Sequence, residues 1–243
     1  MKIIAVNGSP RGEKSNTQTI LASFLKGARA AGAETEIALL SEKRIYPCQG
    51  CFACWVKTPG RCIQKDDMEE LLQKMWKSDL VIFASPLYVD CVSGQLKTFM
   101  DRMLPEILPN FIKVNNVWRH PLRHGPPPKV GVICNSGFPQ REHFQVVHLL
   151  FERVVLNMHT EVVMEIYRPG GEILRAKNLR LRPLIMKYKK LLEKAGREVV
   201  EKGRLSKILK EILEEDIISP DIYIKNANKY WDKELEKLTG EKR

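Results

Sequence analysis

The chain has 243 residues, of which 44% are hydrophobic, and 40 Lys and Arg residues outnumber 29 Asp and Glu residues to give a net charge of +11. This length suits one domain with appended helices better than two full domains. No run of residues is apolar enough to span a membrane, and the first residues do not resemble a signal peptide. We therefore expect a cytoplasmic protein without a membrane partner.

The positive charge does not by itself indicate nucleic acid. Most of the excess lies in residues 168–210, where Lys and Arg alternate with Leu, Ile and Glu in helical sequence. Aromatic residues that would stack on bases are not interleaved with these cations. We therefore consider nucleic acid an unlikely partner and expect a solvated basic face that attracts anionic cofactors or an acidic redox protein.

The first chemical motif follows an apolar run at residues 3–6, which is typical of a strand buried on both faces. A small-residue turn at 7–10 leads into an amphipathic helix whose start contains good capping residues. Free amides and the helix dipole at such a turn favour an anion such as phosphate, although simple capping explains the same residues. The candidate phosphate ligands are Ser9, Arg11, Ser15, Asn16 and Thr17.

Strands and helices alternate through the first 170 residues. We predict strands at 3–6, 35–40, 79–84, 129–134 and 160–167, and helices at 17–31, from 66, 93–103 and 142–157. This alternation predicts an α/β fold with a doubly wound, five-stranded parallel sheet, whose ligands bind at the carboxyl ends of the strands. Turns 8–17, 85–88 and 135–137 all fall at those ends.

Two further regions lie outside this pattern. Residues 105–128 are rich in proline and have no sustained period, so we expect a surface excursion that acts as a lid or a partner-binding loop. The remainder is helical at about 183–202, 205–214 and 220–238. These helices either fold back onto the sheet or form a subunit interface. We place a domain at 1–172 and a C-terminal helical extension at 173–243.

Four cysteines form a compact constellation in the loop 48–62. Cys48, Cys51, Cys54 and Cys62 follow the spacing C-x2-C-x2-C-x7-C, which lets one loop surround a metal centre. Structural zinc usually uses two cysteine pairs that lie further apart, so the spacing favours a [4Fe–4S] cluster, with zinc or metal-free thiols as alternatives. The other two cysteines, Cys91 and Cys134, are expected in the core.

The histidines and the acidic pair Asp66-Asp67 do not form a catalytic pattern. No histidine spacing matches a known metal motif, and the two aspartates are best explained as caps of the following helix. We expect no catalytic acid, base or nucleophile.

Three motifs together resemble a known family. GSPRGEKSNT, the four-cysteine run followed by Asp66-Asp67, and SPLYVDCVSGQLKTFMDR are similar to the NAD(P)H-dependent FMN reductase superfamily. Within it, the compact cysteine motif resembles the iron–sulfur flavoproteins of archaea and other anaerobes. The resemblance covers about residues 1–170.

The resemblance implies a flavodoxin-like fold with FMN and a [4Fe–4S] cluster, often in homodimers or homotetramers. It assigns Ser9, Arg11, Ser15, Asn16 and Thr17 to the FMN phosphate, and the four cysteines to the cluster. The flavin ring and its neighbouring loop correspond to Pro86, Leu87, Tyr88, Asn135, Ser136 and Gly137.

Three functions are compatible with these observations. The first is an FMN-containing iron–sulfur flavoprotein that passes electrons from a ferredoxin-like donor to an acceptor such as oxygen, peroxide or a quinone. The second is an NAD(P)H-dependent FMN or quinone reductase whose cysteines bind zinc or nothing. The third is a zinc-stabilised binding module that contacts nucleic acid through its basic helices.

Overall fold

The structure is a computed structural model and describes residues 1–239. The strands are β1 (Lys2–Asn7), β2 (Glu34–Leu39), β3 (Leu80–Tyr88), β4 (Cys91–Val92), β5 (Ile112–Val114), β6 (Val117–Arg119), β7 (Lys129–Asn135) and β8 (Val162–Arg168). The α-helices are α1 (Asn16–Ala30), α2 (Ala53–Val56), α3 (Met68–Trp76), α4 (Gly94–Asp101), α5 (Gln145–Asn157), α6 (Arg182–Lys202), α7 (Lys207–Glu214) and α8 (Pro220–Thr239). Short 3-10 helices are η1 (Gly12–Lys14), η2 (Leu40–Glu42), η3 (Leu104–Glu106), η4 (Glu142–Phe144) and η5 (Gly171–Arg175).

A parallel sheet with the strand order β2-β1-β3-β7-β8 forms the centre of the molecule. Every neighbouring pair along this path is parallel, so the carboxyl ends of all five strands lie at one edge. The predicted α/β class and the five parallel strands are confirmed, and the two-residue β4 adds a sixth strand that pairs antiparallel with β3. The turns that carry the candidate ligands therefore meet at this edge.

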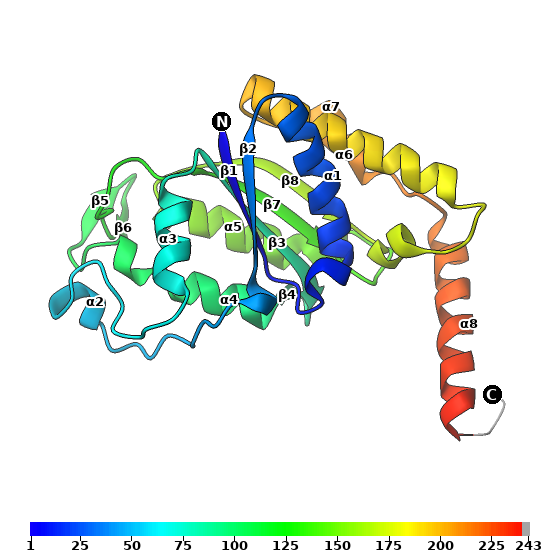
Figure 1. The fold of residues 1–243 in the computed structure, drawn as a ribbon, viewed down its shortest axis with the longest axis horizontal. Helices are drawn as coiled ribbons and strands as arrows, with labels where there is room; N and C mark the ends of the chain where they lie inside the picture. Colours follow the sequence, from blue (N-terminus) through cyan, green and yellow to red (C-terminus); the bar gives the residue numbers. More distant parts are fainter. Residues whose placement is uncertain (240–243) are drawn as a thin grey trace.

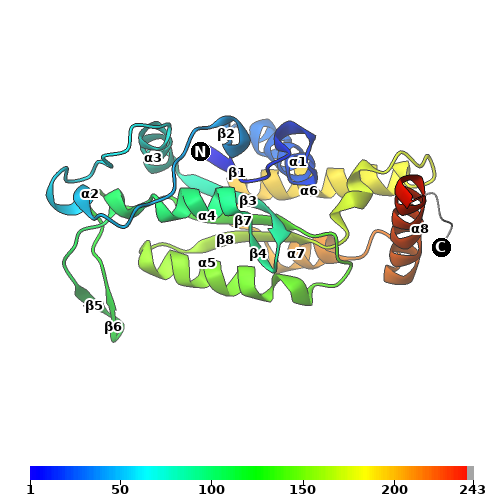
Figure 2. The same ribbon diagram turned by 90° about the horizontal axis from the view of Figure 1, so that it is seen from below.

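Helices cover both faces of the sheet, as Figures 1 and 2 show. Alternate residues of β1 point to opposite faces: Ile3 and Ala5 pack with α1, α6 and α7, whereas Ile4 and Val6 pack with α3, α4 and α5. The predicted buried strand is thus apolar on both sides because it has a helical layer on each side.

Helix α6 packs closely against α1 (Figure 1). Two glycines make this approach possible. A Cβ on Gly27 would lie 1.8 Å from the carbonyl oxygen of Glu193, and a Cβ on Gly196 would lie 1.9 Å from that of Phe24. At each of these two contacts, the glycine on one helix lets the backbone of the other helix approach.

The excursion 105–128 contains structure that the sequence pattern did not predict. Strands β5 and β6 pair as an antiparallel hairpin, and Asn115 and Asn116 form its turn with positive φ angles of 49° and 62°. Paired positive φ angles fit a tight hairpin turn, and asparagine tolerates them better than most residues do. In Figure 2 the hairpin projects from the same end of the molecule as α2.

The C-terminal helices differ in how they meet the sheet. Helix α7 packs beside β8, but α8 extends away from the rest of the chain (Figure 1). Its first turn is anchored where the Tyr223 hydroxyl donates to the carbonyl of Gly137 at 2.9 Å. Further along, Tyr230 is 56% exposed and Trp231 is 60% exposed. Of the two alternatives for this helix, folding back onto the sheet is not observed.

None of the helices between residues 1 and 239 combines the length and the apolar character that crossing a bilayer requires.

We predict that Gly196→Ala destabilises the protein by about 2–3 kcal/mol, because its methyl group would overlap the backbone of α1. Gly94→Ala is the matched control, since a Cβ at this helix position has no neighbouring atom within 4 Å. Urea denaturation of both variants measures the free energy of unfolding. Equal stabilities for the two variants would contradict the close packing of α1 and α6.

Candidate functional site

The turn after β1 is fixed by buried hydrogen bonds that begin α1. Ser15 is the N-cap: its Oγ accepts from the amide of Gln18 at 2.9 Å and donates to the carbonyl of Gly12 at 2.7 Å. The side chain of Asn7 accepts from the amide of Ser9 and donates to Gln18, both at 2.9 Å. Small polar residues thus fold the chain into a rigid turn with the helix start facing the sheet edge.

A side-chain junction links the three candidate turns. The Asn135 Nδ2 atom donates to Thr17 Oγ1 at 2.7 Å and lies 3.5 Å from the carbonyl oxygen of Ser85. All three residues are buried, with relative exposures of 4% or less. Asn135 therefore contacts one residue from each of the other two predicted turns, Thr17 and Ser85, which lie 118 and 50 positions away from it in the chain.

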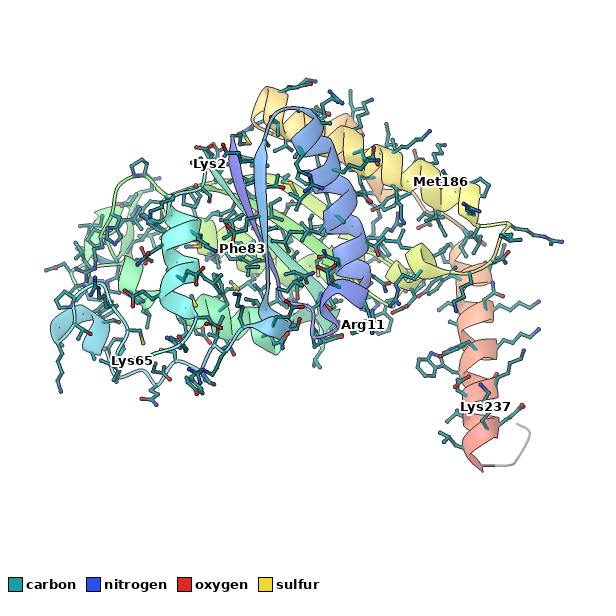
Figure 3. The ribbon with its side chains drawn as sticks, in the orientation of Figure 1. Lys2, Arg11, Lys65, Phe83, Met186 and Lys237 are labelled. Carbon is teal, nitrogen blue, oxygen red and sulfur yellow. The ribbon has the colours of Figure 1, made fainter. Side chains whose placement is uncertain are left out.

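Several polar groups at this junction are oriented for a ligand. The first amides of α1 lack intrahelical acceptors, and the buried Asn16 has a side-chain oxygen without a hydrogen-bond partner among the described residues. Arg11 lies beside this helix start in Figure 3, but its guanidinium pairs with Glu172 at 3.0 Å.

Apolar and aromatic side chains at the end of β3 follow the Ser85 position of the junction. Pro86 and Leu87 are buried in the last part of β3, whereas Tyr88 is 45% exposed. Ser136 donates from its hydroxyl to the carbonyl of Phe138 at 2.9 Å. The carbonyl of Gly137 accepts a hydrogen bond from the Tyr223 hydroxyl of α8. The predicted ligand residues thus line one edge, with an exposed aromatic ring beside them.

The cysteine loop follows β2 and η2 at the same carboxyl edge of the sheet and leads into α3. Positive φ angles at Gly50 (63°) and Gly60 (81°) allow its bends. Cys54 is buried, Cys48 and Cys62 are half-buried, and Cys51 is exposed. Burial, then the neighbouring thiols of Cys62, Cys51 and Cys48, raise the pKa of Cys54. The four predicted ligands therefore share one neighbourhood.

The four thiols do not converge to metal-binding distances in this structure. Among residues 1–239, no three His, Cys, Asp or Glu side chains converge as tightly as a metal centre requires. The donor set still fits a thiolate-bound metal, because four sulfur atoms come from one fifteen-residue loop that has Gly bends and an exposed side.

The base of the cysteine loop is closed by a residue that sequence reasoning missed. Arg102, at the end of α4, bonds through Nη1 to the carbonyl of Tyr46 and to Asp66 Oδ2, both at 2.7 Å. Its Nη2 donates to Asp66 Oδ1 at 3.1 Å. Tyr46 precedes the first cysteine and Asp66 follows the last, so one guanidinium joins both ends of the loop.

The expectation that Asp66 and Asp67 simply cap a helix therefore holds only in part. Asp66 accepts the amide of Met68 at 3.1 Å, which is a capping contact, but Asp67 accepts the amide of Arg44 at 2.7 Å. Burial opposes ionisation of Asp66, yet the bonds from Arg102, Tyr46 and Met68 outweigh it and lower the pKa. Asp66 and Arg102 lie 36 positions apart, so no local sequence pattern predicted their ion pair.

A cavity of about 360 Å³ lies between the cysteine loop and the excursion, lined by residues that include Cys62, Trp76, Glu106 and His124. Glu106 is 7% exposed and lies 3.7 Å from the Nε2 atom of His124. Burial, only partly offset by Arg123, raises the pKa of Glu106 to about 7. The carboxyl group therefore changes charge near neutral pH.

We predict that this carboxyl makes stability fall as pH rises between about 4.5 and 7, because the folded protein binds the proton more tightly than the unfolded chain. Glu106→Gln should remove that loss and be more stable than the parent at pH 8.5 by on the order of 2 kcal/mol. Urea denaturation at pH 5 and 8.5 measures the difference, with exposed Glu142→Gln as control. A parent-minus-variant difference independent of pH would contradict the prediction.

Known proteins match parts of this sequence. Residues 1–120 match the family model for NADPH-dependent FMN reductase. An iron–sulfur flavoprotein of Archaeoglobus fulgidus is 45% identical over 105 residues, which cover 43% of this chain and 46% of that protein. One from Methanocaldococcus jannaschii is 43% identical over 43% of this chain and 53% of its own length. These matches thus span about half the length of either relative.

A longer match includes the third turn region. An iron–sulfur flavoprotein of Methanosarcina thermophila is 33% identical over 148 residues, which cover 61% of this chain and 71% of that protein. Solved structures share the fold at low identity. The NAD(P)H:quinone oxidoreductase of Methanothermobacter marburgensis is 16% identical, with a TM-score of 0.57 over 82% of this chain and 96% of its own.

An FMN-dependent NADH-azoreductase of Bacillus anthracis is similar to the same degree, with 15% identity and a TM-score of 0.57 over 82% of this chain and 99% of its own. These structures support the flavodoxin-like architecture. The relatives of higher identity show the family: residues 1–120 match the NADPH-dependent FMN reductase model, and the chain belongs to the iron–sulfur flavoproteins.

Proposed function

We propose that the chain binds FMN and a [4Fe–4S] cluster and acts as an oxidoreductase between a low-potential, ferredoxin-like donor and a small acceptor such as oxygen, peroxide or a quinone. The observation that carries the flavin part is the junction of Thr17, Ser85 and Asn135 at the carboxyl edge of the sheet. Ligands of doubly wound sheets bind at this place. Family membership supports the same cofactor.

The turn after β1 would hold the phosphate of FMN. The start of α1 offers free amides and the positive end of a helix dipole. The side chains of Ser9, Asn16 and Thr17 would add further polar groups, whereas the Ser15 hydroxyl already donates to the carbonyl of Gly12. The predicted phosphate ligands are Ser9, Arg11, Ser15, Asn16 and Thr17.

The other two turns would hold the flavin ring. Tyr88 offers an exposed aromatic face, and the backbone of the third turn is fixed by Tyr223 and by the Ser136 hydroxyl. Pre-oriented dipoles beside a flavin tune its electron affinity. The predicted ring contacts are Pro86, Leu87, Tyr88, Asn135, Ser136 and Gly137.

The four cysteines would bind the cluster, with zinc or unoccupied thiols as the alternatives. Their x2, x2, x7 spacing on one loop suits a cubane better than the paired cysteines of structural zinc. FMN supplies two-electron and one-electron chemistry, and a cubane cluster supplies one-electron chemistry. Free thiols at this loop require a reducing compartment, so the proposal includes the cytoplasm.

The exposed basic face would receive an acidic electron donor. Lys187, Lys190 and Lys194 are exposed and recur at helical spacing along α6. Charge complementarity mainly accelerates encounter between partners. We also propose a homodimer or homotetramer, since α8 exposes large apolar side chains, including Tyr230 and Trp231.

The family model favours a second candidate, because its description names NADPH as the reductant. In that function the chain would reduce FMN or a quinone with NAD(P)H, and the cysteines would bind zinc or nothing.

We predict that Asn16→Ala weakens FMN binding about tenfold, equivalent to about 1.4 kcal/mol, because it removes the side-chain amide of a buried residue from the phosphate turn. The same change should leave apo-protein stability within about 0.5 kcal/mol, because the removed amide has an unpartnered atom. Flavin fluorescence titration and urea denaturation measure the two effects. Ser23→Ala, further along α1, is the control. Unchanged FMN affinity in Asn16→Ala would contradict the assigned phosphate site.

Anaerobic rapid mixing distinguishes the two functions. We expect reduced ferredoxin to bleach bound flavin faster than NADPH does, with a rate that falls as salt increases. The double variant Lys187→Glu/Lys190→Glu should slow the ferredoxin reaction several-fold. Lys233→Glu/Lys237→Glu, which makes the same charge change on α8, is the control, and Figure 3 shows Lys237 far from Met186 of α6. Faster bleaching by NADPH would favour the reductase.

A further inference from the structure

Arg102 is a buried cation under the cysteine loop. Its side chain is 1% exposed, and its partner, the Asp66 side chain, is fully buried. The two parallel bonds between guanidinium and carboxylate leave Nη1 free to bind the carbonyl of Tyr46 as well. This geometry requires the planar fork of arginine, which a lysine ammonium does not reproduce.

The surrounding backbone completes the closure. Asp66 accepts the amide of Tyr46 at 2.9 Å, so Tyr46 is held by both members of the ion pair. Next to it, the Asp67 amide donates to the carbonyl of Arg44 at 3.1 Å. A buried ion pair contributes little net stability, because desolvation offsets attraction. The ion pair therefore acts on geometry: it holds Tyr46, which precedes Cys48, next to Asp66, which follows Cys62.

The same guanidinium lies close to a candidate metal ligand, since Arg102 and Cys62 line the same cavity. Burial opposes the charge of Arg102, but Asp66 and Cys62 raise its pKa. The Nε atom of Arg102 is buried and has no hydrogen-bond partner among the described residues. A thiolate-bound cluster would provide negative sulfur acceptors in this neighbourhood.

Helix α4 connects this cation to the flavin-side turn. At its start, the Ser93 hydroxyl donates to the carbonyl of Gly8 at 2.5 Å, and a Cβ on Gly8 would lie 2.6 Å from Leu96 Cβ. Eight residues of α-helix rise about 12 Å, and Arg102 follows the last of them. One short helix therefore positions both the turn after β1 and the base of the cysteine loop.

We infer that Arg102 is a positioning residue that closes the cysteine loop and, by its charge beside Cys62, raises the reduction potential of the cluster. The second part rests on the proposed function, and the first does not. Reduction adds negative charge to the centre, so a fixed cation favours the reduced form and a fixed anion disfavours it. Arg102 and Asp66 therefore act on the potential in opposite directions.

The test uses four variants of the full chain after anaerobic reconstitution with iron and sulfide. Arg102→Gln should lower the cluster potential, whereas Asp66→Asn should raise it, as measured by a redox titration followed by EPR. Lys97→Gln, which removes an exposed cation from the same helix, is the matched control and should leave the potential unchanged. Arg102→Lys should restore the potential because it keeps the charge. Equal potentials in all variants, or shifts of the same sign, would overturn the electrostatic role.

Hydrogen exchange of the iron-free proteins tests the closure independently. The amides of Arg44 and Tyr46 donate to Asp67 and Asp66, so both should exchange at least tenfold faster in Arg102→Gln and Asp66→Asn. Exchange in β1 and β3 should stay at the parent rate and shows that the sheet is folded. Unchanged exchange at Arg44 and Tyr46 would overturn the closure.

A parent protein that retains no iron would instead refute the proposed cluster, while the exchange measurement would still decide the closure. If Arg102→Gln does not fold, Asp66→Asn decides both parts through its raised potential and the faster exchange at Arg44 and Tyr46.

Discussion

The amide of Asn135 is the contact on which the flavin-side edge depends. A parallel sheet brings the ends of its strands to one side, but it does not by itself fix the turns that follow them. Here one buried NH2 group reaches Thr17 and the backbone of Ser85, so the first, second and third turns are held together. Because a buried donor without partners costs free energy, the three turns stabilise one another's positions.

The cysteine loop is held by different physics. Its tip exposes Cys51 and the apolar side chains of Phe52 and Val56, so little apolar burial fixes its shape. Polar contacts at its base replace that burial, chiefly the ion pair of Asp66 and Arg102. Charge and hydrogen bonds define a geometry more narrowly than apolar contact does, which suits the proposed role of this loop in binding a cluster through four thiols. The two parts of the site meet through α4.

Local pattern predicted the sheet and its turns, because buried strands are apolar runs and the turns between them contain Ser, Asn, Gly and Pro. The four cysteines were predicted as a set because they lie close together in the sequence. Contacts between distant residues had no such signal. Arg11, chosen as a phosphate cation, also pairs with Glu172, and Arg102 closes a loop that starts more than fifty residues earlier.

The hairpin in the excursion had one local signal that the proline content concealed. Asn115-Asn116 between two short runs is compatible with a tight turn, and the structure places both in the left-handed region. The orientation of α8 had no signal at all, since an amphipathic helix shows which face is apolar but not what covers it.

The central claim is that one chain of this fold carries both a flavin and a cubane cluster. Iron, zinc and FMN per chain, measured on protein purified without oxygen, test it most directly. The account predicts about four irons and one FMN, with zinc absent, as a four-cysteine cubane beside a single flavin site requires. One FMN with zinc or without iron would contradict the cluster and leave the reductase, and the absence of both cofactors would contradict the account as a whole.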